Sequence, residues 1–263
     1  MSISFLVGQM RVRLAGKTDV GQVRALNEDN LLVAKDKPLC VVADGMGGHA
    51  CGEVASRIAV ETIDRFYRDT EADVPSNWPF PMPKVQTELQ RMTTAVKLAN
   101  SRIYWTASQD TQKKGMGCTI DAIFFDKNRT YIGHVGDSRV YRLRNGHLEQ
   151  ITEDHSLLND YRKIRDMSTD EIENFPHKNV VVRGLGLSEH VSVEILMDSY
   201  QLGDLFLLCS DGLNDMLSDE QIANLLIRAQ DGLDAAATAL IDSANAAGGR
   251  DNITVLLAQV EAP

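Results

Sequence analysis

LCVVADGMGG (residues 39–48) and LFLLCSDGLND (residues 205–215) are two apolar runs that each lead abruptly into Asp-Gly. Four or five consecutive apolar residues predict a strand that is buried on both faces. A carboxylate at the end of such a strand costs free energy unless something compensates its charge, and the glycine after it lets the backbone approach closely. The two runs therefore predict that Asp44 and Asp211 deliver carboxylates to one cation site.

Size and charge bound the class of protein. With 263 residues and a hydrophobic content of 43%, the chain can bury a large core, and we predict a single domain over residues 1–263. The net charge of −10 lacks the basic footprint of proteins that bind nucleic acids or anionic membranes, and it disfavours a nuclease. Local binding of a phosphorylated partner, through an arginine and a metal ion, stays compatible with this charge.

The N-terminal segment and the cysteines indicate a compartment. Residues 1–16 have no basic n-region of a signal peptide, and no apolar run approaches the ~20 residues that span a bilayer. None of the four cysteines forms a CxxC pair, which favours buried reduced thiols over a disulfide framework or a zinc site. We therefore expect a cytoplasmic protein.

The hydrophobic pattern predicts an α+β fold with many antiparallel strands. The predicted strands are 11–18, 31–34, 39–43, 118–125, 130–135, 139–143, 147–151, 180–182, 191–197, 205–209 and 253–260. Apolar residues spaced by threes and fours predict helices at 52–66, 85–103, 218–229 and 234–246. Strands in this number with two separated pairs of helices predict a β-sandwich whose outer faces are covered by helices.

Three segments between these elements have distinct turn or loop character. Residues 70–84 hold four of the seven prolines and are expected to form a surface loop. Asn145-Gly146 is a strong signal for a two-residue hairpin turn. Residues 153–178 are polar and mostly helix-like, with a capping box at 168–171, and we expect them to form a mobile flap beside the cation site that influences substrate choice.

Further acidic residues also stand at strand ends, next to turn residues. They are Glu28, Asp29, Asp137 and Asp251. Each alone is more often part of a turn, but their joint occurrence after apolar strands favours a metal site. Oxygen ligands without clustered His or Cys select Mg²⁺ or Mn²⁺, and two such ions can activate a water for in-line displacement at phosphorus.

Two competing motifs are weaker. Residues 45–50 fit a loose GxGxxA, but Asp64 falls inside the first helix, and Asp44 before the first glycine would repel a pyrophosphate. An apolar strand ending in Asp is also typical of phosphotransferases with an aspartyl nucleophile. Those need a second Asp two residues later, where this chain has Met46.

Eight motifs together resemble the bacterial PP2C-type (PPM) metal-dependent Ser/Thr protein phosphatases, in order and spacing, from about residue 16 to 259. They are RALNEDN (24–30), VVADGMGGH (41–49), MGCTIDAIFF (116–125), HVGDSRVYRL (134–143), ITEDHS (151–156), VVRGLG (181–186), LFLLCSDGL (205–213) and GGRDNITVLL (248–257). The resemblance implies a four-layer α-β-β-α sandwich of two antiparallel sheets flanked by helix pairs. It also implies hydrolysis of phosphoserine and phosphothreonine at a dinuclear Mn²⁺ or Mg²⁺ centre.

The resemblance assigns the metal ligands by motif. Asp44 matches the bridging ligand, and Gly45 matches the residue whose carbonyl oxygen binds one ion. Asp211 and Asp251 match the ligands of the other ion. Asp137, with Asp211, matches the position of a third metal in bacterial members.

Other residues match positions around the ions. Glu28 and Asp29 match acidic residues that hold metal-bound waters, and Asn252 is expected to shape the loop of the last ligand. Arg24 matches the arginine that binds the phosphate, and its charge suits a dianionic phosphoryl group. With Asp44 and Asp211, Arg24 makes up the predicted catalytic set.

The chain departs from animal members directly after the first Asp-Gly. They carry a histidine there, proposed as the general acid, where this chain has Met46. We do not transfer that role to His49, and we expect His155 to be structural. The resemblance further implies phosphoproteins and a Ser/Thr kinase as partners, and a monomer. The rival hypothesis is a catalytically silent, regulatory PP2C-like domain, which the complete set of aspartates disfavours.

Overall fold

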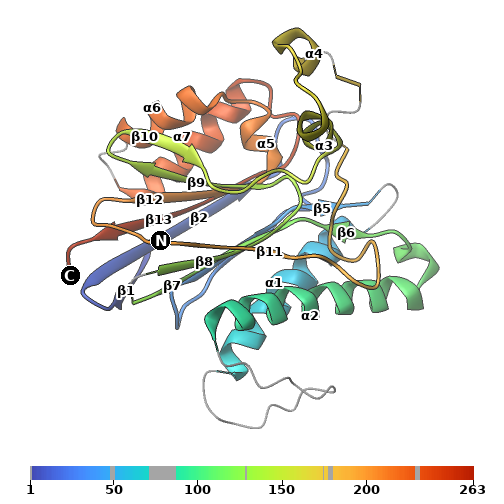
Figure 1. Cartoon of the computed structure of the whole chain (residues 1–263), viewed down its shortest axis with the longest axis horizontal. Coiled ribbons are helices and arrows are strands. Elements are labelled where there is room, and N and C mark those ends of the chain that lie inside the picture. Colours follow the sequence, from blue (N-terminus) through green and yellow to red (C-terminus); the bar gives the residue numbers. More distant parts are fainter. Residues whose placement is uncertain are drawn as a thin grey trace.

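The computed structural model describes residues 2–47, 51–70, 87–127, 129–173, 175–176, 180–228 and 232–263. Two antiparallel sheets pack face to face, and a pair of helices covers the outer face of each (Figure 1). The predicted α+β fold, a four-layer α-β-β-α sandwich, is confirmed.

The strands form one large sheet, one smaller sheet and a short ribbon. The six-stranded sheet has the order β1 (Ile3–Val7), β2 (Met10–Asp19), β13 (Ile253–Glu261), β12 (Leu205–Cys209), β9 (Arg139–Arg144), β10 (His147–Gln150). The five-stranded sheet has the order β11 (Glu194–Asp198), β8 (Arg129–Val135), β7 (Ile120–Asp126), β4 (Leu39–Ala43), β3 (Asn30–Val33). The ribbon pairs β5 (Gly45–Met46) with β6 (Gly117–Cys118).

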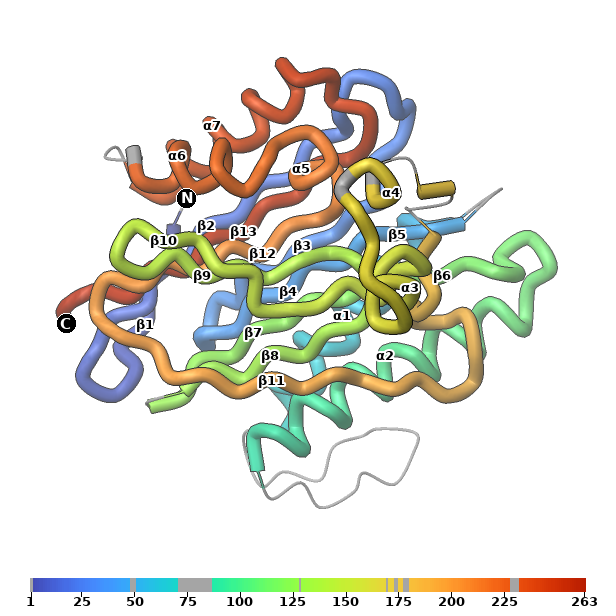
Figure 2. Tube along the Cα trace, turned by 45° about the horizontal axis from the view of Figure 1, so that its top comes forward, coloured from blue at the N-terminus to red at the C-terminus, as the bar shows by residue number. Residues whose placement is uncertain are grey.

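The helices fall into three groups. The five-stranded sheet is covered by α1 (Gly52–Asp69) and α2 (Glu88–Gln109), and the six-stranded sheet by α6 (Asp219–Arg228) and α7 (Leu233–Ala246). The flap, residues 153–178, contains α3 (Leu157–Ile164) and α4 (Thr169–Glu173), and a short α5 spans Asp211–Asn214. Figures 1 and 2 both place α3 and α4 at the end of the sandwich that carries β5 and β6.

The two apolar runs become the inner strands β4 and β12, and both are buried along their whole length. In β4, Val41 faces α1 and α2, while Val42 faces the other sheet. In β12, Leu207 faces α6 and α7, while Leu208 packs between the sheets. Because both faces of each strand meet apolar neighbours, a continuous apolar run is the pattern that this position requires.

Several predicted elements differ from the structure. Residues 180–182 were expected to form a strand but make only a single bridge, between Val181 and Ser156, because no partner strand runs beside them. Strand β11 begins at Glu194 rather than at 191. β1 and the ribbon of β5 and β6 were not predicted. The expected loop at 70–84 lies almost wholly outside the described residues, as does His49.

Two predictions that rest on short local motifs, the hairpin turn at 145–146 and the capping box at 168–171, are confirmed. Asn145 and Gly146 have φ of 51° and 79°, which a two-residue hairpin turn needs. In the capping box at 168–171, Glu171 Oε2 accepts from the backbone N–H of Ser168 at 2.9 Å. Cys40, Cys118 and Cys209 are buried and unpaired, while Cys51 is half-buried. No helix within the described ranges is long and apolar enough to cross a membrane.

Candidate metal centre

Asp44 and Asp211 meet across the sandwich although they follow strands of different sheets. Asp44 comes directly after β4, and Asp211 follows β12 by one residue and begins α5. Burial raises the pKa of Asp44 well above its usual value, and the charges of Asp29, Asp211 and Asp137 raise it further. Burial likewise raises the pKa of Asp211, and among the neighbouring charges that of Asp137 raises it most. Four carboxylates, two of them buried (Asp29 and Asp137) and two half-buried (Asp44 and Asp211), therefore lie close together, as two ions with a bridging ligand would need.

The glycine of each Asp-Gly is required by a close approach of two backbone segments. A Cβ at Gly45 would lie 2.3 Å from the carbonyl oxygen of Gly52, and a Cβ at Gly212 would lie 2.0 Å from that of Asn252. Both distances are far below contact distance. The absence of a side chain at these two positions lets β5 pack against the start of α1 and α5 pack against the start of β13. These close contacts hold the backbone next to Asp44 and next to Asp211 in place.

Asp29 shows most clearly that this region suits a cation. Its Oδ2 accepts hydrogen bonds from Ser210 Oγ at 2.7 Å and Thr254 Oγ1 at 2.6 Å. Its Oδ1 is buried without a hydrogen-bond partner, and so is Oδ1 of Asp211. Burial raises the pKa of Asp29 to about 6. Since unpaired buried carboxylate oxygens are costly, these two fit positions that face a metal ion or its bound water.

Asp137 is held from the other side of the site. It is buried, and burial together with the nearby charge of Asp154 raises its pKa to about 6. Thr119 links this turn to the first Asp-Gly: its Oγ1 accepts from the backbone N–H of Asp44 at 3.0 Å and shares a 2.7 Å hydrogen bond with Ser138 Oγ. Buried hydroxyls thus tie the turn that carries Asp137 to the backbone of Asp44.

Asp251 and its neighbour close the site on its exposed side. Arg24 Nη2 donates to Asp251 Oδ2 at 2.6 Å, and both side chains are partly exposed. Asn252 donates from Nδ2 to the carbonyls of Val20 and Leu26 at 3.0 Å each. Its Oδ1 accepts from the backbone N–H of Glu28 at 2.7 Å. Asn252 therefore ties together the segment that carries Arg24 and the loop that carries Asp251, as expected of a residue that shapes the loop.

Glu28 and Asp29 diverge although they are adjacent. Asp29 points into the buried carboxylates, whereas Glu28 accepts a hydrogen bond from the backbone N–H of Gly52 at the start of α1. Burial raises the pKa of Glu28, and the charge of Glu53 raises it further. The structure places Asp29 beside Asp44 and Asp211, and Glu28 at the edge of the same region.

A second group of potential ligands, His134, His155 and Glu194, lies beside the flap within the described ranges. The backbone N–H of Gly136 donates to His155 Nδ1 at 3.0 Å, so the neutral ring carries its proton on Nε2. That nitrogen faces Glu194 at 3.3 Å and the guanidinium of Arg183 at 2.9 Å. Burial and the charges of His134 and Arg183 lower the pKa of His155 to about 3. Protein contacts at both ring nitrogens of His155, with a guanidinium beside Nε2, disfavour a metal ion in this group.

Sequence reasoning missed the hydroxyls that hold the carboxylates. Ser210, Thr254 and Thr119 are at most 1% exposed and each contacts an acidic residue of the site. A usable signal was present: Ser210 directly precedes Asp211, and Thr119 and Thr254 are polar residues inside apolar strand patterns. Buried hydroxyls in such positions need a partner.

Comparisons with known proteins point to one family. Residues 21–255 match the family Protein phosphatase 2C. The serine/threonine phosphatase Stp of Listeria welshimeri is 37% identical over 246 residues, covering 92% of this chain and 94% of that protein. The phosphatase PstP of Mycobacterium tuberculosis is 35% identical over 95% of this chain but only 45% of its own length.

Solved structures agree with the sequence relatives. The PstP catalytic domain in complex with two manganese ions matches with a TM-score of 0.80 at 35% identity, covering 95% of this chain and 98% of that one. The serine/threonine phosphatase of Streptococcus agalactiae matches with a TM-score of 0.84 at 33% identity, covering 95% and 100%.

Proposed function

This chain belongs to the protein phosphatase 2C family, and we propose that it hydrolyses phosphoserine and phosphothreonine in proteins with two Mn²⁺ or Mg²⁺ ions. The observation that carries the proposal is the group of Asp29, Asp44, Asp137 and Asp211. Burial raises the pKa of each, the charges of Asp29 and Asp137 raise the pKa of Asp44 and Asp211 further, and Oδ1 of Asp29 and Oδ1 of Asp211 are buried without hydrogen-bond partners. An external cation compensates the ionised form of such a group without burying a protein cation beside it.

We assign the ligands from their places in this group. Asp44 would bridge the two ions, the carbonyl oxygen of Gly45 would bind one, and Asp211 and Asp251 would bind the other. Asp137, with Asp211, would bind a third ion. When bound, the ions lower the pKa of a water and stabilise in-line displacement at phosphorus. Glu28 and Asp29 would hold coordinated waters, and the contacts of Asn252 keep the loop of Asp251 in place.

Arg24 would bind the phosphoryl group. Its side chain is half exposed at the mouth of the site, and the ion pair with Asp251 occupies Nη2 of a guanidinium that offers five N–H donors. A guanidinium presented to solvent beside the metal ligands suits a dianionic phosphate. The same ion pair places Arg24 within reach of the metal region before any substrate arrives.

The leaving alkoxide needs a proton that Met46 does not supply. Met46 is part of the ribbon of β5 and β6, and its Cε lies 3.0 Å from the position of a Cβ built on Gly184. A thioether has no proton to donate. We therefore propose that a water protonates the leaving group, without a side-chain acid at this position.

The substrates are phosphoproteins. We propose that the protein acts as a monomer in the cytoplasm, as one domain over 1–263, and opposes a Ser/Thr kinase. The flap would contribute to substrate choice because α3 and α4 stand at the end of the sandwich that carries β5. Deleting the flap should then change turnover of phosphopeptides more than turnover of p-nitrophenyl phosphate.

The function is tested on protein stripped with a chelator. Addition of Mn²⁺ should restore hydrolysis of p-nitrophenyl phosphate and of a phosphothreonine peptide, and Asp44→Ala or Asp211→Ala should abolish both. Turnover that ignores the chelator, or normal turnover by either variant, would contradict the proposal. Calorimetry separates it from a silent regulatory domain: two or more Mn²⁺ sites support the enzyme, and no binding supports the rival.

A further inference from the structure

The turn that carries Asp137, residues 136–139, is held from both sides by two consecutive residues at the entrance of the flap. On its upstream side, the backbone N–H of His155 donates to the carbonyl oxygen of Gly136 at 2.7 Å. The N–H of Gly136 returns a hydrogen bond to His155 Nδ1 at 3.0 Å. This reciprocal pair fixes the two peptide units on either side of the Gly136 Cα, directly before Asp137.

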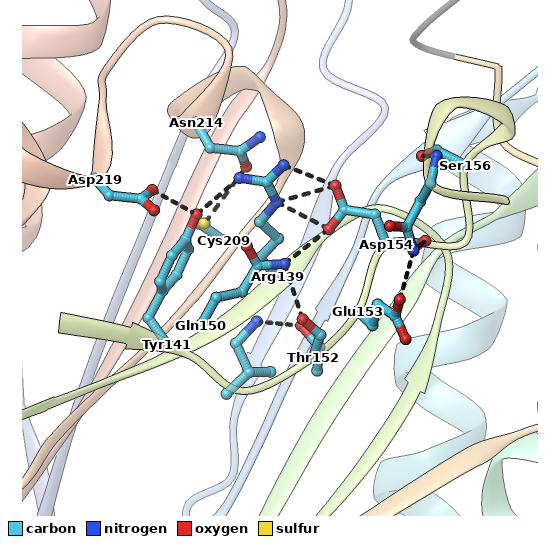
Figure 3. A network of polar contacts seen from close by, with 12 residues as sticks. Arg139, Tyr141, Gln150, Thr152, Glu153, Asp154, Ser156, Cys209, Asn214 and Asp219 are labelled. Carbon is cyan, nitrogen blue, oxygen red and sulfur yellow. Dashed lines mark hydrogen bonds and ion pairs between the residues drawn. The ribbon is translucent and has the colours of Figure 1, made fainter. Parts of the chain in front are cut away.

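On the downstream side, Arg139 binds Asp154 through a forked ion pair. Arg139 Nε donates to Oδ1 at 2.9 Å, and Nη2 donates to Oδ2 at 2.7 Å. Figure 3 shows the guanidinium of Arg139 between Asp154 and Tyr141, whose hydroxyl accepts from Nη1 at 2.9 Å. The planar fork fixes the direction of Arg139 more tightly than a point charge would.

The same two residues belong to the base of the flap. Ser156, the next residue, is the N-cap of α3 and accepts from the backbone N–H of Asn159. The N–H of Val182 donates to the carbonyl of His155 at 2.9 Å, and the N–H of Leu157 donates to that of Val180 at 2.9 Å. The outgoing and returning segments of the flap are thus joined at the residues that grip the Asp137 turn.

The turn itself has little freedom to adjust. Gly136 has φ of 123°, and a Cβ there would lie 2.6 Å from the side chain of Thr119. Ser138 Oγ is hydrogen-bonded to Thr119 Oγ1 at 2.7 Å. With Gly136, Ser138 and Arg139 all fixed, the place of the Asp137 carboxylate follows from what holds its neighbours.

We propose that Asp154 and His155 are positioning residues for Asp137, so that the base of the flap and this metal ligand form one mechanical unit. This inference rests on the proposed function, since it concerns the ion that Asp137 would bind. Its consequence is that metal binding at Asp137 and the placement of the flap over the substrate influence each other. Partners that hold a metal ligand in place typically contribute 10–100-fold to metal affinity.

The test is a calorimetric Mn²⁺ titration of the full chain. Arg139→Lys keeps the charge but loses the fork, and it should weaken the Asp137-dependent binding event by roughly tenfold. Arg144→Lys is the matched control, because Arg144 forms a similar fork with Asp204 at the opposite end of the same strand, β9. It should bind Mn²⁺ like the wild type. Thermal unfolding establishes that both variants fold.

A double-mutant cycle asks whether the effect passes through Asp137. Asp137→Ala should remove or weaken one binding event, and Arg139→Lys should add nothing further in that background. His155→Ala, with the exposed His147→Ala as control, should repeat the pattern. The wild-type protein must first bind Mn²⁺ and hydrolyse phosphate esters. If Arg139→Lys then binds Mn²⁺ as tightly as Arg144→Lys does, the positioning role is wrong while the proposed function stands. Additive effects with Asp137→Ala also contradict it. If the wild type binds no Mn²⁺, both proposals are wrong.

Discussion

The two ends of the sandwich carry similar acidic residues and treat them in opposite ways. Strand β12 is directly preceded by Asp204 at one end, and at its other end it is followed by Ser210 and then Asp211. Asp204 is 1% exposed and accepts both arms of Arg144 at 2.7 Å. Asp211 is half-buried, yet its Oδ1 atom is buried without a hydrogen-bond partner, and the charges that act on it are other carboxylates.

The same contrast extends to neighbouring strands. At the end with Asp204, Asp198 pairs with Arg142, and Glu261 pairs with Arg13. At the other end, Arg24 forms an ion pair with Asp251, one of the predicted metal ligands, and the Arg24 side chain is half exposed at the rim of the site. Since burying an unpaired carboxylate costs several kcal/mol, the end with Asp204 is compensated within the chain, whereas the end with Asp211 supports the proposal of an external cation.

The largest expected difference between the two ends is in activity. Asp211→Asn should lower kcat/KM for a phosphopeptide by roughly 10³-fold or more, because it removes a ligand of the ions that stabilise the transition state. Asp204→Asn, the same change at the other end, should leave kcat/KM within about twofold of wild type. Steady-state kinetics in saturating Mn²⁺ measure both, and comparable losses in the two variants would break the comparison.

Stability should respond in the reverse order. Asp204→Asn leaves Arg144 without its carboxylate and should cost roughly 3 kcal/mol in the free energy of unfolding. In metal-free protein, Asp211→Asn should stabilise the fold, because it removes a buried charge among like charges. Urea unfolding in the presence of a chelator measures both values. A loss of stability in metal-free Asp211→Asn would contradict the view that this carboxylate is uncompensated.

The metal-free protein should lose stability as the pH rises. The pKa of Asp29 and of Asp137 is about 6 in the folded chain against 3.8 for an ordinary Asp. The folded state therefore binds more protons, and the stabilisation present below pH 4 disappears as the pH passes 6. For Asp29 this amounts to roughly 3 kcal/mol.

Thermal unfolding between pH 5 and pH 7.5 with a chelator measures this effect. Asp29→Asn is the control, and its curve should be flatter because the titrating group is gone. Mn²⁺ should restore stability at the higher pH. A wild-type protein that gains stability from pH 5 to pH 7.5 without metal would show that the carboxylates are compensated within the chain.

The smallest expected effect lies at the rim of the site. Arg24→Ala should raise KM for a phosphopeptide by roughly tenfold, the value of one charge-assisted hydrogen bond. Arg13→Ala, which removes a partly exposed arginine paired with Glu261 at the other end, should leave KM unchanged. An unchanged KM in Arg24→Ala would remove this residue from the phosphate-binding role.

The prediction from sequence succeeded where the signal is local. Strands β4 and β12 have the predicted bounds, 39–43 and 205–209, since a continuous apolar run is the direct result of burial on both faces. Residues 180–182 were misjudged because three consecutive valines fit a strand pattern, yet a strand also needs a neighbouring strand, and here only one bridge forms. The pairing of Gly45 with Cys118 was not predicted because strands of two residues are too short to show a periodic pattern.

The sequence by itself determined the fold class and the list of acidic residues at strand ends, because alternation, apolar runs and Asp-Gly turns are properties of neighbouring residues. The tertiary structure decided which of those strand ends meet. Asp44 and Asp211 leave different sheets, and their approach depends on how the sheets pack and on two glycines that let distant backbone segments touch. It also decided which acidic residues are compensated, since the partner of Asp204 is an arginine on a neighbouring strand, whereas Oδ1 of Asp211 has no hydrogen-bond partner.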